Sequence, residues 1–404
     1  MRTRAVTRAA QGRRLPDELI VEVIEWCDRL ADMRTATLAS LCRVSKRYQE
    51  AAERRLYSGI NLQDAVLGSG RSAKVRKRSA VGTLMRQARL RPLVKALYVT
   101  RDEDAETDLF AGLLGKLTNV EEVDCQCRAG CLQKLSDLLA HGNVRLRAIR
   151  VPAWDDNLQA VVRNHPHVFS ALERVCLTWP TANLTMPALA PSLRALHISL
   201  DGSATFAAAL AASCRDTLVH LRIPIPRSGQ THDFAGFRHL QSLVLAVTAE
   251  LGAIGWGEAA PHLVLTLHSM AALTSLRSFA VEGRLVITRP LWGPPGEFAP
   301  IGSAVTNPAE FPSSSKRILA AIPPQIRHLS LVTSCFLADD VAAYLRSTDR
   351  PRELATLRIG DEVGRGVAGI LGDSTGPFGS LADTLARAGV DVTTVGPFDK
   401  MGEP

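Results

Sequence analysis

A six-residue sequence motif, apolar-x-x-apolar-x-apolar, decides the fold, and we call it the repeat word. It is clearest between residues 172 and 245. It reads Leu172-Glu-Arg-Val175-Cys-Leu177, Leu193-Arg-Ala-Leu196-His-Ile198, Leu218-Val-His-Leu221-Arg-Ile223 and Leu240-Gln-Ser-Leu243-Val-Leu245. The alternation at the end of each word places two side chains on one face of a short strand. One such strand cannot cover its own apolar face, so neighbouring words must stack on one another.

The same repeat word recurs along the chain, and its ten copies begin at Val94, Val120, Leu146, Leu172, Leu193, Leu218, Leu240, Leu276, Ile326 and Leu354. Successive copies are 26, 26, 26, 21, 25, 22, 36, 50 and 28 residues apart, and leucine-rich repeats have a period of roughly 20 to 29 residues. The words resemble irregular leucine-rich repeats. We therefore expect an α/β fold, with an irregular leucine-rich-repeat solenoid over residues 93–360 that has parallel strands on its concave face and helices outside. An ordinary α/β domain is the alternative, because two spacings break the period.

Two segments interrupt or end the array. Residues 290–315 are rich in Pro, Gly and Ser, which continue neither a helix nor a central strand, and they predict a solvated insertion. Residues 361–404 begin with a Gly-rich stretch, followed by an expected helix at 380–388 and an expected strand at 390–395. This atypical end predicts a cap for the open stack of apolar layers.

In the first 57 residues, apolar residues recur at helical spacing instead. Leu15 and Pro16 open a helix, with Pro in the first turn, where its missing N–H costs nothing. Three helices in so few residues bury little apolar surface, which implies a partner surface. Apolar positions at helical spacing in the first helix predict one stripe that seeks burial, namely Leu19, Ile20, Val23, Ile24 and Cys27.

Residues 15–57 agree in order and spacing with a known family. The agreement consists of Leu15-Pro16-Asp17-Glu18-Leu19-Ile20, then Ile24, then Leu38-Ala-Ser-Leu41-Cys-Arg-Val44-Ser45-Lys-Arg-Tyr48, and finally Leu56-Tyr57. The segment resembles an F-box. That resemblance implies docking onto the adaptor subunit of a cullin-RING (SCF) ubiquitin ligase, and through the adaptor onto the cullin. By position, the contact would be formed or supported by Leu15, Pro16, Leu19, Ile20, Ile24, Leu41, Val44 and Tyr48.

With the repeats behind it, the resemblance implies a non-catalytic substrate-recognition subunit, whose helices bind the ligase and whose repeats bind a target protein. Two alternatives stay open. The helices could form a bundle that packs only on the next domain of their own chain. The whole protein could be a leucine-rich-repeat interaction scaffold with no role in ubiquitin transfer.

The strand face offers candidate target-binding residues. The residue between the last two apolar positions of each word points outward, and several of these positions and their outward neighbours are basic. Guanidinium groups pair bidentately with carboxylates and phosphates. We therefore expect an acidic or phosphorylated target segment to bind Arg150, Arg174, His197 and Arg222, while an ordinary solvated face is the alternative.

Composition and charge exclude several classes of protein. The chain has 404 residues, of which 46% are hydrophobic and 22% charged, a balance typical of folded proteins. No apolar run reaches the roughly 18 residues that span a membrane. The net charge of +8 comes from five Arg in residues 1–14 and eight Lys or Arg in residues 68–92, and neither tract holds an acid. Because the remainder is net negative, this argues against nucleic-acid binding by the whole protein.

The basic tracts and the cysteines indicate how the chain is divided into segments and where in the cell we expect the protein. We expect a disordered tail at 1–14 and a basic linker with the first repeat at 58–92. The run Lys74-Val-Arg76-Lys77-Arg78 reads equally as a nuclear-import signal or as a solvated loop. Eight cysteines without a secretory signal favour reduced thiols, and hence a cytoplasmic or nuclear protein.

Three motifs could carry chemistry, and the context of each argues against it. Gly364-Arg-Gly366-Val-Ala-Gly369 has dinucleotide-binding spacing, but further Gly and Pro follow where a helix should open. Gly372-Asp-Ser374-Thr-Gly376 resembles a nucleophile elbow, but the last histidine, His328, precedes Ser374 instead of following it. Cys125-x-Cys127-x3-Cys131 lacks the second ligand pair of a zinc site, and Cys125 fills an inward repeat position. We expect no enzyme activity, no cofactor and no metal.

Overall fold

The computed structural model describes residues 17–29, 34–61, 80–99, 113, 116–125, 135–136, 139–140, 144–179, 192–198, 211–212, 214–224, 234, 236–246, 270–282, 312–332, 338–360 and 389–395. The chain divides into two compact units. Unit 1 consists of Met1–Arg150 and Ala160–Ala171, and unit 2 of Val151–Gln159 and Leu172–Pro404. The predicted tail 1–14, the site residues Leu15 and Pro16, the run 74–78 and the glycine motifs between 364 and 376 lie outside the described residues.

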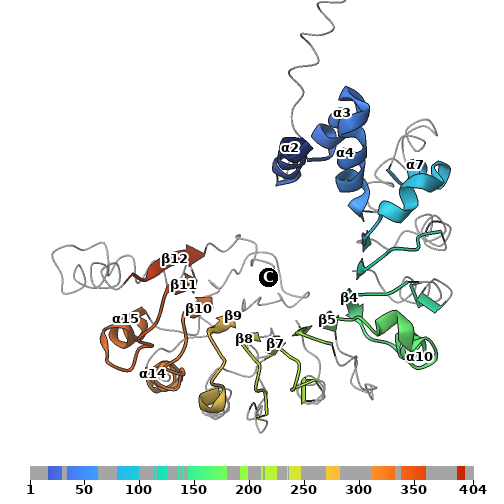
Figure 1. Ribbon diagram of the computed structural model, residues 1–404. Coiled ribbons are helices and arrows are strands. Elements are labelled where there is room, and N and C mark those ends of the chain that lie inside the picture. Colours follow the sequence, from blue (N-terminus) through green and yellow to red (C-terminus); the bar gives the residue numbers. More distant parts are fainter. Residues whose placement is uncertain are drawn as a thin grey trace, which may run out of the picture. The chain divides into compact units, whose positions relative to one another are not determined.

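Unit 1 begins with three packed helices, α2 (Asp17–Arg29), α3 (Arg34–Val44) and α4 (Lys46–Ser58), drawn in blue in Figure 1. Ser45 caps α4, because its side-chain oxygen accepts a hydrogen bond from the backbone N–H of Tyr48. The buried cluster between the helices is small and consists of Ile20, Ile24, Cys27, Leu38 and Ala52. The predicted helices are therefore present as a three-helix module.

The helical module continues directly into the first strands of unit 1. Helix α4 passes into β1 (Gly59–Asn61), which pairs in parallel with β2 (Ala96–Val99); β3 (Glu122–Cys125) and β4 (Ala148–Ala153) follow in chain order. Helix α7 (Ala80–Arg86) and the 3-10 helix η1 (Ala88–Leu93) precede β2. The boundary between the compact units thus does not separate helices from strands.

Unit 2 continues the pattern with eight strands, again parallel and in chain order. They are β5 (Arg174–Trp179), β6 (Ala195–Ile198), β7 (His220–Pro224), β8 (Ser242–Ala246), β9 (Ser278–Glu282), β10 (His328–Val332), β11 (Thr356–Gly360) and β12 (Asp391–Val395). Between β4 and β5 lie α10 (Asp156–Asn164), which is divided between the units, and η2 (Pro166–Phe169) of unit 1. Between later strands of unit 2 lie η3 (Met270–Ala272), α14 (Pro312–Ala320) and α15 (Ala338–Arg346). In unit 2, α14 and α15 lie together on one side of the strands (Figure 1).

Each of the ten repeat words ends in one of the strands β2 to β11, and its first apolar residue is buried in every copy. Backbone hydrogen bonds fix the register from repeat to repeat. The carbonyl of Arg194, for example, accepts the N–H groups of Val219 and His220, and the carbonyl of Val219 accepts those of Gln241 and Ser242. The predicted fold class, an α/β chain with a parallel-stranded leucine-rich-repeat array, is confirmed.

Two details differ from or extend the expectation. The turn-rich insertion expected at 290–315 ends earlier, because Pro312 starts α14 and the following serines belong to that helix. Proline suits the first turn of a helix, since its missing N–H has no partner there in any case. At the other end, β12 pairs in parallel with β11 and adds one strand to the array.

Candidate interaction surfaces

Helix α2 has two adjacent apolar faces, and only one of them is buried. Ile20, Ile24 and Cys27 lie at i, i+4 and i+7 and pack into the helical core. Leu19, Val23 and Trp26 have the same spacing one residue earlier, and they are 41%, 40% and 62% exposed. Because successive residues of a helix are about 100° apart, these three side chains form a second stripe beside the buried one. We call Leu19, Val23 and Trp26 the exposed α2 face.

The predicted adaptor contact therefore separates into two groups. Leu19 and Val44, the latter at the end of α3, are exposed. Ile20 and Ile24 are buried, while Leu41 and Tyr48 are partly buried and pack against the same cluster. Ile20 and Ile24 can support the surface from beneath, whereas Leu19 and Val44 can touch a partner directly.

Sequence reasoning treated the α2 positions as one stripe that seeks burial, and it gave Trp26 no role. The signal that could have separated the faces is the width of the apolar pattern. Residues 19, 20, 23, 24, 26 and 27 are all apolar, which is more than a helix needs to cover a small core of two neighbouring helices. An exposed apolar stripe of this kind on a soluble protein marks an interaction site more often than a scattered apolar residue does.

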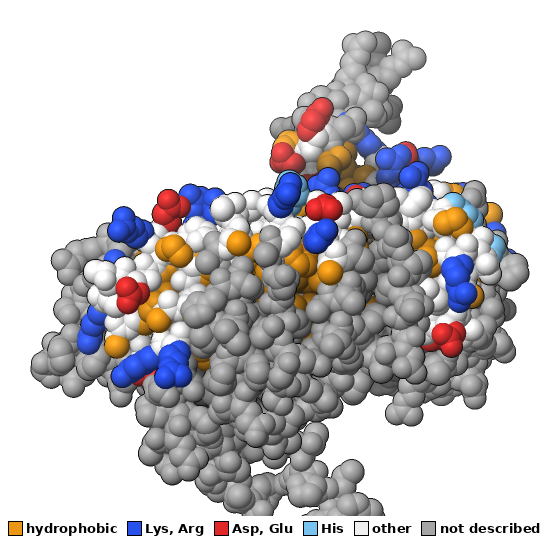
Figure 2. All heavy atoms as spheres, turned by 90° about the horizontal axis from the view of Figure 1, so that it is seen from below, with side chains coloured by type: hydrophobic (Ala, Val, Ile, Leu, Met, Phe, Trp, Pro, Cys, Tyr) orange, Lys and Arg blue, Asp and Glu red, His pale blue; other side chains and the backbone are white. Residues whose placement is uncertain are grey.

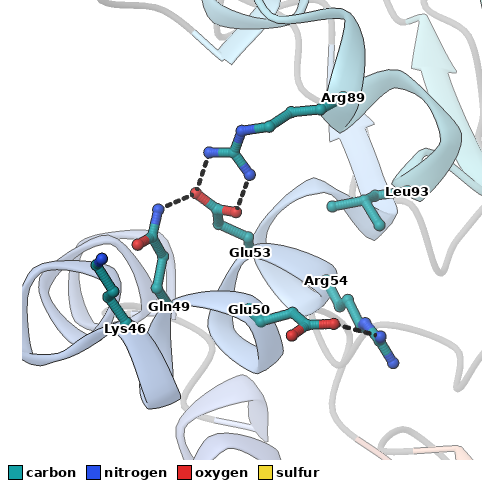
Figure 3. A pocket seen from close by; sticks show the side chains of 7 residues that line it. All are labelled: Lys46, Gln49, Glu50, Glu53, Arg54, Arg89 and Leu93. Carbon is teal, nitrogen blue, oxygen red and sulfur yellow. Dashed lines mark hydrogen bonds and ion pairs between the residues drawn. The ribbon is translucent and has the colours of Figure 1, made fainter.

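Helix α4 and η1 line a polar pocket of about 530 Å³ (Figure 3). Glu53 is buried at its base and accepts two hydrogen bonds from Arg89 of η1, at 2.7 and 2.9 Å, and one from Gln49 at 2.9 Å. Glu50 and Arg54 form a separate, exposed pair on α4. The lining is completed by Lys46 and Leu93. Glu53 and Glu50 are already paired with arginines of this chain. We therefore interpret the pocket as a structural contact between α4 and η1, and we call the Glu53–Arg89 pair the Glu53 joint.

The Glu53 joint has a predicted pH dependence. The hydrogen bonds from Arg89 hold the pKa of the Glu53 carboxyl below its usual 4.5, although burial acts in the opposite direction. A lowered folded-state pKa means that the stabilisation is complete above the unfolded-state pKa and is lost as the pH falls through the folded-state value. We expect the free energy of unfolding to differ most between the parent chain and Glu53→Gln near about pH 6, with the difference shrinking below about pH 4. Urea unfolding of both chains across this range measures it, and a difference that stays constant with pH would contradict the assignment.

The four predicted target-binding residues are divided between the two compact units. Arg150 belongs to unit 1, where it lies opposite Asp124 on the neighbouring strand and donates a hydrogen bond to it at 3.2 Å. Arg174, His197 and Arg222 lie on the adjacent strands β5, β6 and β7 of unit 2. His197 and Arg222 are direct neighbours in register, so the structure brings together three of the four.

Arg222 already has an acidic partner within the protein. Its guanidinium donates to Glu282 of β9 at 2.8 Å, reaching across β8, and the hydroxyl of Ser330 on β10 donates to the same carboxylate at 3.3 Å. The residues beneath this link are small or of medium size, Val244, Ala246 and Ala280, which leaves room for the arginine to cross. Beside it, burial lowers the pKa of His220 and so favours the neutral imidazole. The cationic character of this strand face is weaker than the count of basic residues suggests.

Removing the Glu282 carboxylate is expected to destabilise unit 2. The side chains of Arg222 and Glu282 are 20% and 12% exposed, and leaving a charged donor without its buried acceptor costs about 1 to 3 kcal/mol. We expect Glu282→Gln to lower the free energy of unfolding by this amount, measured in urea. The control is Glu353→Gln, which removes a shorter but exposed pair with Arg327, at 2.6 Å, and is expected to cost less than about 1 kcal/mol. Equal losses in the two variants would show that the Arg222–Glu282 pair is no stronger than a surface pair.

Basic and acidic side chains are interspersed on the face drawn in Figure 2, and the described residues there form no extended patch of one sign. Among the described residues, no group of three His, Cys, Asp or Glu side chains could hold a metal ion. Cys125 is fully buried at its inward strand position. No helix within the described ranges has the length and apolar character needed to cross a membrane.

Comparison with known proteins found distant structural similarities. No protein-family model matches the sequence, and no curated protein matches it. Among solved structures, the leucine-rich repeat-containing protein LegL7 from Legionella pneumophila is similar, with 14% identity, a TM-score of 0.34, and coverage of 86% of this chain and 93% of that one. TLR13, solved in complex with ssRNA13, has 13% identity, a TM-score of 0.27, and coverage of 70% of this chain and 38% of that one.

The repeat array has the architecture of a protein-interaction scaffold. Stacked repeats present long surfaces that a single compact domain cannot offer. In this chain the strand face of unit 2 is such a surface, and the exposed α2 face of the helical module is a second candidate interaction surface.

Proposed function

We propose that this protein is a non-catalytic substrate receptor of an SCF-type ubiquitin ligase, in which the helical module binds the ligase adaptor and the repeats bind the target protein. The observation that carries the proposal is the exposed α2 face within the segment that resembles an F-box. Leu19, Val23 and Trp26 leave a continuous apolar stripe in water, and burial of such side chains contributes about 25 cal/mol per Å² of apolar surface. An adaptor that covered this stripe would gain that energy.

The buried residues of the same segment supply rigidity. Ile20 and Ile24 anchor α2 on α3 and α4, and Arg55 of α4 pairs with Glu25 of α2 at 3.0 Å. A preformed surface loses less conformational entropy on binding than a flexible one. Leu15 and Pro16 keep the role that the resemblance gives them, as residues at the amino end of the same contact.

On the target side we propose that β5 to β7 bind an acidic or phosphorylated segment through Arg174 and His197. The Arg222–Glu282 pair limits this site, because a target carboxylate would have to compete with Glu282 for the guanidinium. A phosphate has more charge and more acceptor oxygens than a carboxylate, so we expect phosphorylated peptides to compete best. An oligo-glutamate peptide and an oligo-glutamine peptide of equal length are suitable first probes. Equal affinity for the two, or no loss with Arg174→Gln, would contradict this part of the proposal.

The ligase role is tested by affinity purification of the tagged chain from a eukaryotic extract, beside a Leu15→Ala, Pro16→Ala double variant. We expect the adaptor and cullin with the parent chain and their loss with the variant, provided that the variant keeps its circular dichroism spectrum and thermal midpoint. Absence of both proteins from the parent sample would leave the repeats as an interaction scaffold without a ligase role.

A further inference from the structure

The junction between the helical module and the strands contains no loop. Helix α4 ends at Ser58, and Gly59 already has extended torsions, with φ −125° and ψ 125°. A Cβ on Gly59 would lie 3.2 Å from the ring of Tyr98, so β1 begins in close contact with a side chain of β2. Such short junctions can act as hinges, since a few torsions at the end of an element can redirect it. The direction of α4 therefore depends on contacts farther along the helix.

Glu53 and Arg89 make such a contact. Glu53 lies five residues before Ser58, about 7 Å along the helix at 1.5 Å per residue, and its two bonds to Arg89 join α4 to η1. Arg89 is held in turn, because η1 is tied to α7 by bonds from Arg91 to the carbonyls of Leu84 and Met85 at 3.0 and 2.8 Å. Immediately after η1, the N–H of Lys95 bonds to the carbonyl of Ser58. The Glu53–Arg89 pair thus connects the side of α4 to η1 and α7, which precede β2 in the chain.

The geometry of the Glu53–Arg89 ion pair suits it to fixing the angle between two structural elements. A guanidinium and a carboxylate joined by two parallel hydrogen bonds fix direction as well as distance, which an apolar contact does not. Gln49 donates a third bond and orients the carboxylate from one turn earlier on α4. The apolar cluster that packs α2, α3 and α4 together is formed by other residues, so we expect the single variants to keep the helical module folded, and circular dichroism checks this.

We propose that the Glu53–Arg89 pair is a positioning contact, which fixes the angle between the α2–α4 module and the strands β1 to β3. Its purpose rests on the proposed function: a fixed angle would hold an adaptor bound at α2 in a constant orientation relative to the first repeat strands. Both residues act through orientation and touch neither partner.

The test measures the angle directly, in the full-length chain. Spin labels are introduced through noncanonical residues at Ser40 on α3 and Thr118 before β3, both exposed and in unit 1, so that the native cysteines stay unlabelled. Pulsed electron paramagnetic resonance then gives the distribution of distances between them. We expect a narrow distribution for the parent chain and one roughly twofold broader for Glu53→Gln and for Arg89→Lys, since lysine cannot form the bidentate fork. The charge-swapped pair, Glu53→Arg with Arg89→Glu, is expected to narrow it again.

A control from the same pocket separates positioning from general loss of charge. Glu50→Gln breaks the exposed Arg54–Glu50 pair within α4 and is expected to leave the distribution unchanged. Single variants as narrow as the parent chain would overturn the proposal. So would broadening that the charge swap does not reverse, because the cause would then be altered packing.

A second readout distinguishes failure of this inference from failure of the proposed function. In a reconstituted ligase, the single variants should bind the adaptor with unchanged affinity but transfer ubiquitin to a target more slowly. Unchanged transfer by variants with broadened distances would show that the angle has no role in positioning. If the parent chain binds no adaptor, the ligase role is lost, while the distance measurement still decides whether the pair sets the angle.

Discussion

Replacing Val23 by Asp is expected to weaken binding of the ligase adaptor by about 100-fold or more, which corresponds to about 3 kcal/mol. Val23 lies at the centre of the exposed α2 face, between Leu19 and Trp26. In the free protein the new carboxylate would remain in water, so folding should be unaffected. In the complex it would be buried against an apolar partner without a compensating charge, which costs several kcal/mol. Calorimetric titration of purified adaptor into the two chains measures the difference.

The same helix provides a matched control. Val21 is 48% exposed but lies about 160° around the helix from Val23, away from the exposed α2 face. Val21→Asp introduces the same change at similar exposure and is expected to leave adaptor affinity within about threefold of the parent chain. If both variants bound equally well, or both lost binding equally, the exposed α2 face would not be the adaptor contact.

The largest expected loss of stability comes from Phe279→Ala. Phe279 is fully buried on β9 and lies in register with Leu243 on β8 and Leu329 on β10. Truncating a buried phenylalanine to alanine costs about 3 to 5 kcal/mol, because it removes apolar burial and leaves a cavity. Repeat arrays are stabilised mainly by contacts between neighbours, so loss of this layer also weakens the packing of β8 and β10. Urea unfolding followed by circular dichroism measures the change.

The neighbouring Ser278 serves as the control for Phe279. It points to the other face of β9 and is only partly buried. Ser278→Ala is expected to change the free energy of unfolding by no more than about 0.5 kcal/mol. A cost below about 1 kcal/mol for Phe279→Ala would contradict the inward packing of this layer.

The strands could be predicted from the sequence because each repeat word shows where a strand lies and which of its side chains point inward. The first leucine of a word, such as Leu218, and the alternating pair Leu221 and Ile223 are all buried as the pattern implies. Even the irregular intervals of 36 and 50 residues did not disturb the prediction, since the extra residues lie between words and leave each strand intact.

The surfaces were harder to predict, because they depend on pairs that the sequence does not bring together. Arg222 and Glu282 are sixty residues apart in the chain, yet the register of β7, β8 and β9 places them in contact. Glu53 and Arg89 meet in the same way across a segment with no repeat word. On α2, the sequence showed an apolar pattern but not its division into a buried and an exposed face, since that division depends on where α3 and α4 pack.

The most direct test of the account is the mass of the particle that the purified chain forms with purified adaptor and cullin, measured by light scattering during size-exclusion chromatography. We expect a single peak whose mass is the sum of one copy of each of the three proteins, and we expect this peak to be lost when the Val23→Asp chain is used. Separate elution of the parent chain from an intact adaptor–cullin complex would contradict the proposal that this protein is a ligase receptor.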